Sequence, residues 1–164
     1  MADDTAEITA LFWKELRSDR TAMLGLDHET GPRPMTAQID GDADRGPIWF
    51  FGGKDNDLTQ KVMGGQHEGY MTFVSKSHSV FASVDGRLSL SNDRATIDRL
   101  WNPFVAAWYP DGGKDDPNLA LLRFDPTQAK LWRNTGGGLL AMVRGWMGAD
   151  PEPEAEKNVA EVRL

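Results

Sequence analysis

Cationic side chains and glycines gather in one short part of the sequence, residues 33–61. Arg33 opens one apolar segment, and a Gly-Gly-Lys run at 52–54 closes the next. A helix is predicted directly afterwards, with Asn56 or Asp57 placed to cap it. Cationic side chains, exposed backbone N–H groups and a helix start together suit a bound phosphate. The pattern therefore favours a phosphate site, and an ordinary hairpin with solvated ends remains the alternative.

No other set of chemically active residues can be assembled from the sequence. The three histidines, His28, His67 and His78, fall in predicted loops or at strand edges, and His67 with Glu68 could supply two metal ligands. No second cluster has the spacing of metal ligands, and the glycine patterns of P-loops, dinucleotide folds and serine hydrolases are absent. With no cysteine, a thiolate nucleophile is also absent. We therefore expect no metal site and no catalytic residue, so redox chemistry would need an organic cofactor.

Composition limits the classes of partner. The chain has 164 residues, 40% of them hydrophobic, and a net charge of −7. This length predicts one domain, 1–164, with a core over about 5–135 and a C-terminal extension over 136–164. The acidic balance argues against nucleic-acid binding, although a local cationic cluster can still bind a small anion. No segment has the ~20 apolar residues of a membrane span and the N-terminus does not resemble a signal peptide, so we expect a cytoplasmic protein.

Apolar alternation predicts about seven strands and a final edge strand. In chain order they are 20–26, 34–39, 48–51, 69–75, 80–84, 119–124, 129–133 and 159–164. Gly86 indicates a bulge or tight bend through which the strand at 80–84 would continue into 87–91.

Helical periodicity predicts helices that flank these strands. Residues 5–17 carry an apolar face of Ile8, Leu11, Phe12 and Leu16 after a cap at Asp4 or Thr5. Residues 57–64 and 139–147 are predicted to form short helices, and residues 150–157 an acidic linker.

The remaining helix follows a cap at Ser91 or Asn92. Ile97, Leu100, Trp101, Phe104, Val105 and Trp108 recur along it at helical spacing. Pro103 breaks it, and Asn102 caps a second short helix. Helices inserted singly among strands do not suit a parallel sheet, so a mainly antiparallel barrel with flanking helices is predicted.

Short motifs in a fixed order carry a family resemblance. They are PRPM at 32–35, IWFF at 48–51, SVDG at 83–86, LWNP at 100–103, WYPDG at 108–112, DDPNLALLR at 115–123 and AKLW at 129–132. Together they resemble the general stress protein family within the pyridoxamine 5′-phosphate oxidase-like, flavin-binding split β-barrels. The resemblance covers about residues 5–135, and LWNP, WYPDG and DDP are its specific part. It implies an antiparallel split barrel of six or seven strands, a homodimer, and two FMN sites at the dimer interface.

The same resemblance implies a set of FMN-binding residues. The matching positions are Arg33, Pro34, Met35, Gln38, Phe50, Phe51, Gly52, Gly53, Lys54, Asp57, Leu58, Lys61, Phe81 and Trp132. Arg33, the turn at 54–58 and Lys61 match the phosphate-binding part. Residues 35–38 would run beside the flavin, and 50–53 would pass its ring and ribityl chain. Phe81 and Trp132 resemble contacts made by the second subunit.

Three departures from the family pattern qualify this implication. Gly52 stands where the family often has a threonine whose hydroxyl binds phosphate. The segment after WFF is about one residue longer than usual, which would shift Asp57, Leu58 and Lys61 by one position. The C-terminal Arg-x-His segment that holds the substrate in pyridoxamine phosphate oxidases is absent, which argues against that activity.

The resemblance leaves three hypotheses. The first is an FMN-binding homodimer in which any activity is flavin redox chemistry on an unknown substrate, as in a flavin-dependent oxidoreductase. The second is a flavin-free dimeric binding or structural module of the same fold, favoured by Gly52 and by the lack of a catalytic set. The third is a barrel that binds a deazaflavin or haem instead.

Overall fold

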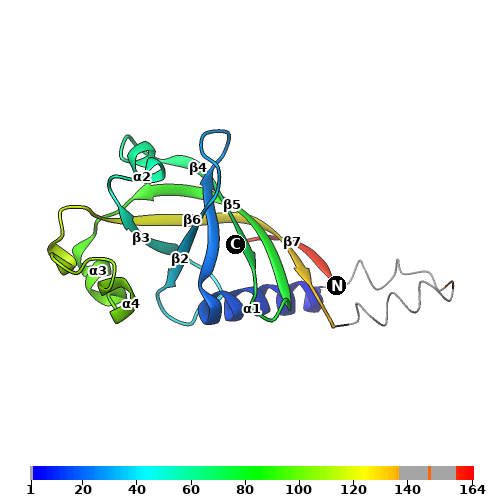
Figure 1. Cartoon of the computed structure of the whole chain (residues 1–164). Coiled ribbons are helices and arrows are strands. Elements are labelled where there is room, and N and C mark those ends of the chain that lie inside the picture. Colours follow the sequence, from blue (N-terminus) through cyan, green and yellow to red (C-terminus); the bar gives the residue numbers. More distant parts are fainter. Residues whose placement is uncertain (1, 137–147, 149–157) are drawn as a thin grey trace.

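Seven antiparallel strands form one sheet that closes on itself (Figure 1). The computed structural model describes residues 2–136, 148 and 158–164. The strands are β1 Thr21–Leu26, β2 Arg33–Ile39, β3 Ile48–Gly53, β4 His67–Val74, β5 Val80–Leu90, β6 Leu119–Arg133 and β7 Val159–Arg163. Their order is β3-β2-β1-β4-β5-β6-β7, and an additional pairing of β3 with β6 closes the first six into a barrel. The predicted antiparallel barrel is confirmed.

β6 is the strand on which this closure depends. Its first half pairs with β3, from Leu119 to Phe124, and its second half pairs with β7, from Gln128 to Trp132. β5 pairs with it from Leu122 to Arg133. The predicted final edge strand is therefore present as β7, which continues the sheet beyond the closed barrel.

The prediction of two strands at 119–124 and 129–133 was wrong, because β6 does not turn at the intervening Asp-Pro-Thr-Gln. Pro126 lies opposite Gly86, where the β5–β6 register shifts between Asp85 and Gly86. A Cβ at Gly86 would lie 2.5 Å from the Asp125 carbonyl oxygen and 2.7 Å from the Phe124 ring. The bulge predicted at Gly86 is confirmed, and it lets a proline be accommodated inside a long strand.

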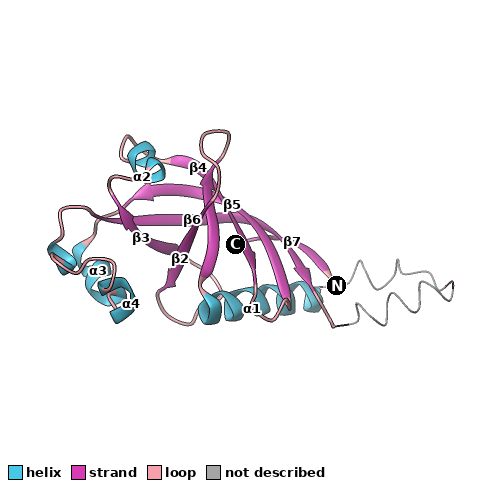
Figure 2. Cartoon of the chain, in the orientation of Figure 1, coloured by secondary structure: helices cyan, strands magenta, loops and turns pink. Residues whose placement is uncertain are grey.

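The helices lie at the ends and on the outside of the barrel. They are α1 Ala2–Asp19, α2 Asp57–Val62, α3 Arg94–Leu100, α4 Pro103–Ala106 and the 3-10 helix η1 Gly113–Asp115. Figure 2 shows α1 running below the strands and α2 above them. The predicted face of α1 is confirmed, since Ile8, Phe12 and Leu16 are buried in the main core and Leu11 packs against it. The predicted cap at Asp4 or Thr5 was wrong, because the helix already includes both residues.

A second, smaller core covers the outer side of β3 and β6. Trp49 and Leu121 pack there against Ile97, Leu100 and Val105 of α3 and α4. The predicted buried face was wrong at its end, because Phe104 is 81% and Trp108 82% exposed. Asn102 and Pro103 restart the helix, as predicted, and the restart changes the direction in which later side chains point.

The remaining differences from the predictions concern the start of α3 and two segments that lie outside the described residues. Asp93 caps α3, so the predicted cap at Ser91 or Asn92 was wrong. The predicted helix at 139–147 and the acidic linker at 150–157 lie outside the described residues. Of the helices that are described, none is both long and apolar enough to cross a membrane.

Candidate functional site

Strands β2 and β3 stop pairing at the end of the barrel that carries α2. Their ladder holds three pairs and ends at Ala37 and Phe50, whereas β3 continues to pair with β6 as far as Gly53. Past Ala37, Met35 still lies beside Gly52, because its Cε would be 3.5 Å from a Cβ at Gly52. Arg33 lies two residues before Met35 at the start of β2, and Lys54 follows directly after Gly53, the last residue of β3. We call this place, formed by Arg33, Met35, residues 52–54 and the start of α2, the β2–β3 site.

Arg33 supplies a buried donor to this site. It lies opposite Leu24, a fully buried core residue of β1, so its side chain starts on the inner face of the barrel. Its Nε is buried and has no hydrogen-bond partner among the described residues. A buried guanidinium N–H without an acceptor is unfavourable, and an anion is the partner that it prefers. The donor set at this end of β2 therefore fits a bound anion.

The two glycines of β3 keep the backbone of the site free of side chains. A Cβ at Gly52 would lie 3.5 Å from Met35 Cε and 3.3 Å from Asn56 Nδ2. One at Gly53 would collide with the side chain of Asp55. Neither position therefore has room for a side chain of its own, because side chains of neighbouring residues already surround it.

The start of α2 is fixed by Asn56. Its Oδ1 accepts a hydrogen bond from the Thr59 N–H at 2.8 Å, and its Nδ2 donates to the Gly53 carbonyl at 2.8 Å. Asn56 is thus the cap, one of the two predicted residues, and Asp57 is the exposed first residue of the helix. Leu58 is buried in the core, so only the backbone N–H groups of Asp57 and Leu58 can serve the site.

Lys61 is held one turn further along by Glu29. Its Nζ lies 3.7 Å from Glu29 Oε2, and His67 Nδ1 lies 3.0 Å from Glu29 Oε1. The hydrogen bond with His67, supported by the charges of His67 and Lys61, lowers the pKa of Glu29. Glu29 also lines a surface pocket of about 570 Å³ formed by residues 26–31 and Tyr70. Lys61 therefore reaches the β2–β3 site only by giving up an exposed ion pair.

Of the other predicted residues of this region, Pro34, Gln38 and Phe51 face away from Met35, and Phe50 lies on the same inner face. Gln38 is 5% exposed on the outer side of β2, where its Oε1 accepts from Asn102 Nδ2 at 3.3 Å. The ring of Phe51 meets Trp101 edge-on at 5.9 Å, and Phe50 is buried in the barrel core. Pro34 is exposed opposite Met23. Phe50 can therefore offer a ligand its backbone alone.

The loop after α4 supports the site from outside. Tyr109 Oη donates to the Gly52 carbonyl at 2.7 Å, and the Lys54 N–H donates to the Asn118 carbonyl at 2.8 Å. Burial, and after it the charges of Asp116 and Asp55, raise the pKa of Tyr109 to about 12, so its hydroxyl stays protonated. Neither contact was predicted from the sequence, although both residues belong to the WYPDG and DDPN motifs that marked the family resemblance.

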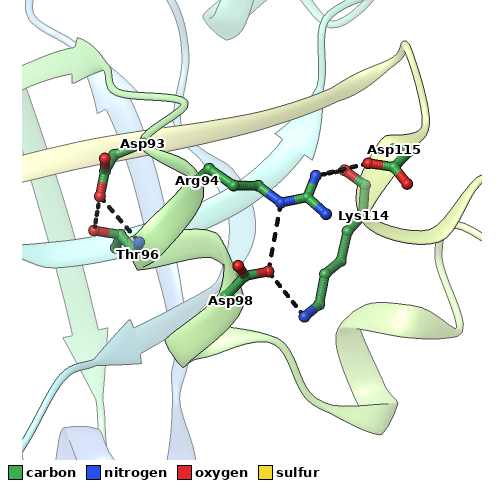
Figure 3. A network of polar contacts seen from close by, with 6 residues as sticks. All are labelled: Asp93, Arg94, Thr96, Asp98, Lys114 and Asp115. Atoms are coloured by element: carbon green, nitrogen blue, oxygen red, sulfur yellow. Dashed lines mark hydrogen bonds and ion pairs between the residues drawn. The ribbon is translucent and has the colours of Figure 1, made fainter.

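A polar network ties this loop to α3 (Figure 3). Arg94 Nη1 lies 2.7 Å from Asp115 Oδ1, and Lys114 Nζ lies 2.9 Å from Asp98 Oδ1. Asp93 caps the helix through the N–H and hydroxyl of Thr96, and these hydrogen bonds lower its pKa. The network fixes the segment 109–118 against α3, and this segment carries both contacts to the β2–β3 site.

Phe81 and Trp132 lie elsewhere on the molecule. They are a directly opposite pair on the outer face of β5 and β6, and they are 37% and 36% exposed. Val74 of β4 and Val159 of β7 continue the same line, and both are also exposed. We call these four residues the outer apolar row. Since β1 and β4 separate β2 from β5 by about 14 Å, the row does not join Arg33 within one chain.

The described residues contain no cluster of three or more side chains that could hold a metal ion. The chemistry of the β2–β3 site is therefore that of Arg33, Lys54, two glycines and a helix start, a donor-rich set that suits an anionic ligand.

Comparison with known proteins agrees on one family. The family model described as "Pyridoxamine 5'-phosphate oxidase like" matches residues 7–149. One similar structure is the crystal structure of the general stress FMN/FAD binding protein from Xanthomonas citri, which is 55% identical in sequence and has a TM-score of 0.74. The match covers 79% of this chain and 91% of the Xanthomonas citri chain. A structure from Jannaschia sp. CCS1 named for general stress protein 26 is 32% identical over 98% of this chain and 99% of its own, with a TM-score of 0.79.

One curated protein shows a shorter match. General stress protein 26 of Bacillus subtilis (strain 168) is 31% identical over 51 residues, which are 31% of this chain and 35% of that protein. The matched segment therefore spans about a third of this curated relative.

Proposed function

Because the chain belongs to the Pyridoxamine 5'-phosphate oxidase like family, we propose that it binds a flavin, with FMN as the first candidate, at the β2–β3 site. The observation that carries this proposal is the buried Nε of Arg33, which has no partner among the described residues. Arg33 opens β2, and Lys54 follows the end of β3, the strand that pairs with β2. The Xanthomonas citri relative, named as an FMN/FAD binding protein, supports the same choice of ligand.

The phosphate is the part of the ligand for which the residues are best suited. Arg33 and Lys54 bind it by charge-assisted hydrogen bonds, and the start of α2 adds backbone donors. Met35, which lies beside Gly52, offers an apolar contact. Tyr109 and Asn118 hold this backbone in place from the other side.

A bound flavin would supply hydride and electron transfer. The protein's own part is to bind and orient the flavin and to exclude water from it, since the site offers no acid, base or nucleophile in a catalytic arrangement. The activity that this supports is that of a flavin-dependent oxidoreductase.

The outer apolar row provides the reason for a homodimer. Four directly opposite apolar residues on four neighbouring strands are exposed in the single chain, and two of them are aromatic. Aromatic side chains of this kind anchor protein interfaces. In the proposed dimer, Phe81 and Trp132 of one copy cover the flavin held by the β2–β3 site of the other.

Titration of the purified protein with FMN, followed by flavin fluorescence, tests the assignment. The double substitution Arg33→Ala and Lys54→Ala should abolish flavin retention, because it removes both cations that face the phosphate. The double substitution Arg45→Ala and Lys76→Ala removes the same two types of charge from exposed positions and should leave affinity unchanged. Equal FMN affinity in the two double variants would contradict the site.

A wild-type protein that binds no flavin would support the second hypothesis, a flavin-free module of the same fold. Parallel titrations with FAD, a deazaflavin and haem distinguish that outcome from a change of cofactor. In each case the fold described above would stand.

A further inference from the structure

Thr59 carries a buried hydroxyl without a partner. It lies in the first turn of α2, its side chain is fully buried, and its Oγ1 has no hydrogen-bond partner among the described residues. The backbone N–H of the same residue is already bonded to Asn56. Buried hydroxyls are normally paired, so one that is not calls for an explanation.

Two other helical threonines show the ordinary behaviour. Thr9 Oγ1 donates to the Thr5 carbonyl at 2.8 Å, and Thr96 Oγ1 donates to Asp93 Oδ2 at 2.6 Å. A threonine within a helix can usually reach a carbonyl or a capping side chain of the preceding turn in this way. Thr59 uses neither route, so its hydroxyl remains available to a group that lies outside the helix.

The hydroxyl faces the part of β3 that has no side chain. A Cβ at Gly52 would lie 3.7 Å from Thr59 Oγ1 and 3.5 Å from Met35 Cε. The remaining polar neighbour, Asn56 Nδ2, already donates to the Gly53 carbonyl. Thr59 therefore presents an uncommitted donor to the β2–β3 site, as the buried Nε of Arg33 does.

We infer that Thr59 is a further phosphate ligand, whose hydroxyl, beside Gly52, donates to the phosphate of the flavin nucleotide. This inference rests on the proposed function and adds a neutral donor to the cations Arg33 and Lys54. A phosphate accepts several hydrogen bonds at once, and a buried hydroxyl gains a partner only when the phosphate is present. Thr59 thereby favours flavins that carry a phosphate over riboflavin, which has none.

The test compares the affinities of FMN and riboflavin in three proteins by fluorescence titration. Thr59→Val keeps the shape of the side chain and removes the hydroxyl, and Thr59→Ser keeps the hydroxyl. Thr59→Val should weaken FMN binding about 10- to 100-fold and leave riboflavin binding unchanged. Thr59→Ser should bind FMN within about threefold of the wild type, the scatter expected for one contact that is kept.

The melting temperature of the flavin-free protein separates a ligand role from a structural one. Because the hydroxyl has no partner in the free protein, Thr59→Val should not lower that temperature. Thr59→Ala serves as a second hydroxyl-free variant if valine disturbs packing. Unchanged FMN affinity in both hydroxyl-free variants, or an equal loss of FMN and riboflavin, would overturn the assignment while flavin binding stands. No FMN binding by the wild type would overturn the proposed function and this inference with it.

Discussion

The hydroxyl of Tyr109 connects two parts of the chain that lie far apart in sequence. It donates to the Gly52 carbonyl, so the loop after α4 holds the end of β3. Burial raises the pKa of this tyrosine from 10.0 to about 12, and the folded protein therefore keeps the proton over a wider pH range than the unfolded chain. The strand end at the β2–β3 site thus depends on a donor from outside the barrel.

Replacing Tyr109 by phenylalanine should lower stability by about 1 kcal/mol, the usual net contribution of one hydrogen bond. The pKa is higher in the folded state, so this contribution is fully present below pH 10.0 and is lost as the pH rises towards about 12. Urea unfolding at several pH values measures both effects. A wild-type stability that does not fall over this alkaline range, or that falls equally in Tyr109→Phe, would contradict the account.

Single residues of the site differ in how far the sequence predicts them. Arg33 and Lys54 were predicted from their charge and their place beside apolar runs, and they lie at the start of β2 and just after the end of β3. Thr59 was missed because its importance comes from an absent partner, and a partner can be counted only in three dimensions. Tyr109 was missed because its acceptor is a backbone carbonyl 57 residues away.

Among the elements, the pairing of β5 with β6 depends most on one glycine. Gly86 lies at the register shift, against the carbonyl of Asp125 and the ring of Phe124. The backbone of β6 cannot move away from an added Cβ there without losing its pairing with β5. The bulge is therefore specific to a residue without a Cβ.

The substitution Gly86→Ala should destabilise the protein by about 3 kcal/mol, the upper end of the cost of overpacking. The matched control is Gly31→Ala, because a Cβ at Gly31 meets nothing within 4 Å. That control should change stability by less than about 0.5 kcal/mol. Urea unfolding midpoints of the two variants provide the measurement, and equal midpoints would show that β6 adapts to the added methyl group.

The sequence predicts elements well where their pattern is local. Apolar alternation located β1 to β5, and Asn102 with Pro103 located the start of α4. It failed at β6, where Asp125 and Pro126 resemble a turn but lie opposite the bulge. It also failed at Phe104 and Trp108, because a helical period cannot be carried across a proline that restarts the helix.

At the scale of the whole molecule, the outer apolar row gives the proposed dimer its interface. Changing Phe81 and Trp132 together to serine should convert the dimer to monomers and weaken FMN binding at least tenfold, because both rings leave the interface and the flavin. Light scattering during size-exclusion chromatography measures the mass. Phe104→Ser, which removes an 81% exposed ring from α4, should leave the dimer intact. A double variant that stays dimeric with unchanged FMN affinity would contradict the proposed interface.

The closure of the barrel shows the limit of sequence reasoning at this scale. The number of strands and the single helices between them predicted an antiparallel barrel, which is confirmed. The pairing that closes it joins Ile48 to Phe124 across more than half of the described barrel sequence. Nothing local in either segment specifies that pairing, which follows from burying both strands around a common core.

Native mass spectrometry of the protein after incubation with FMN tests the central claim most directly, because it counts chains and cofactors together. The account predicts one main species, two chains of 18.2 kDa each with two molecules of FMN. A species without flavin, or a single chain that binds FMN as firmly as the dimer does, would contradict a flavin site completed by the second copy.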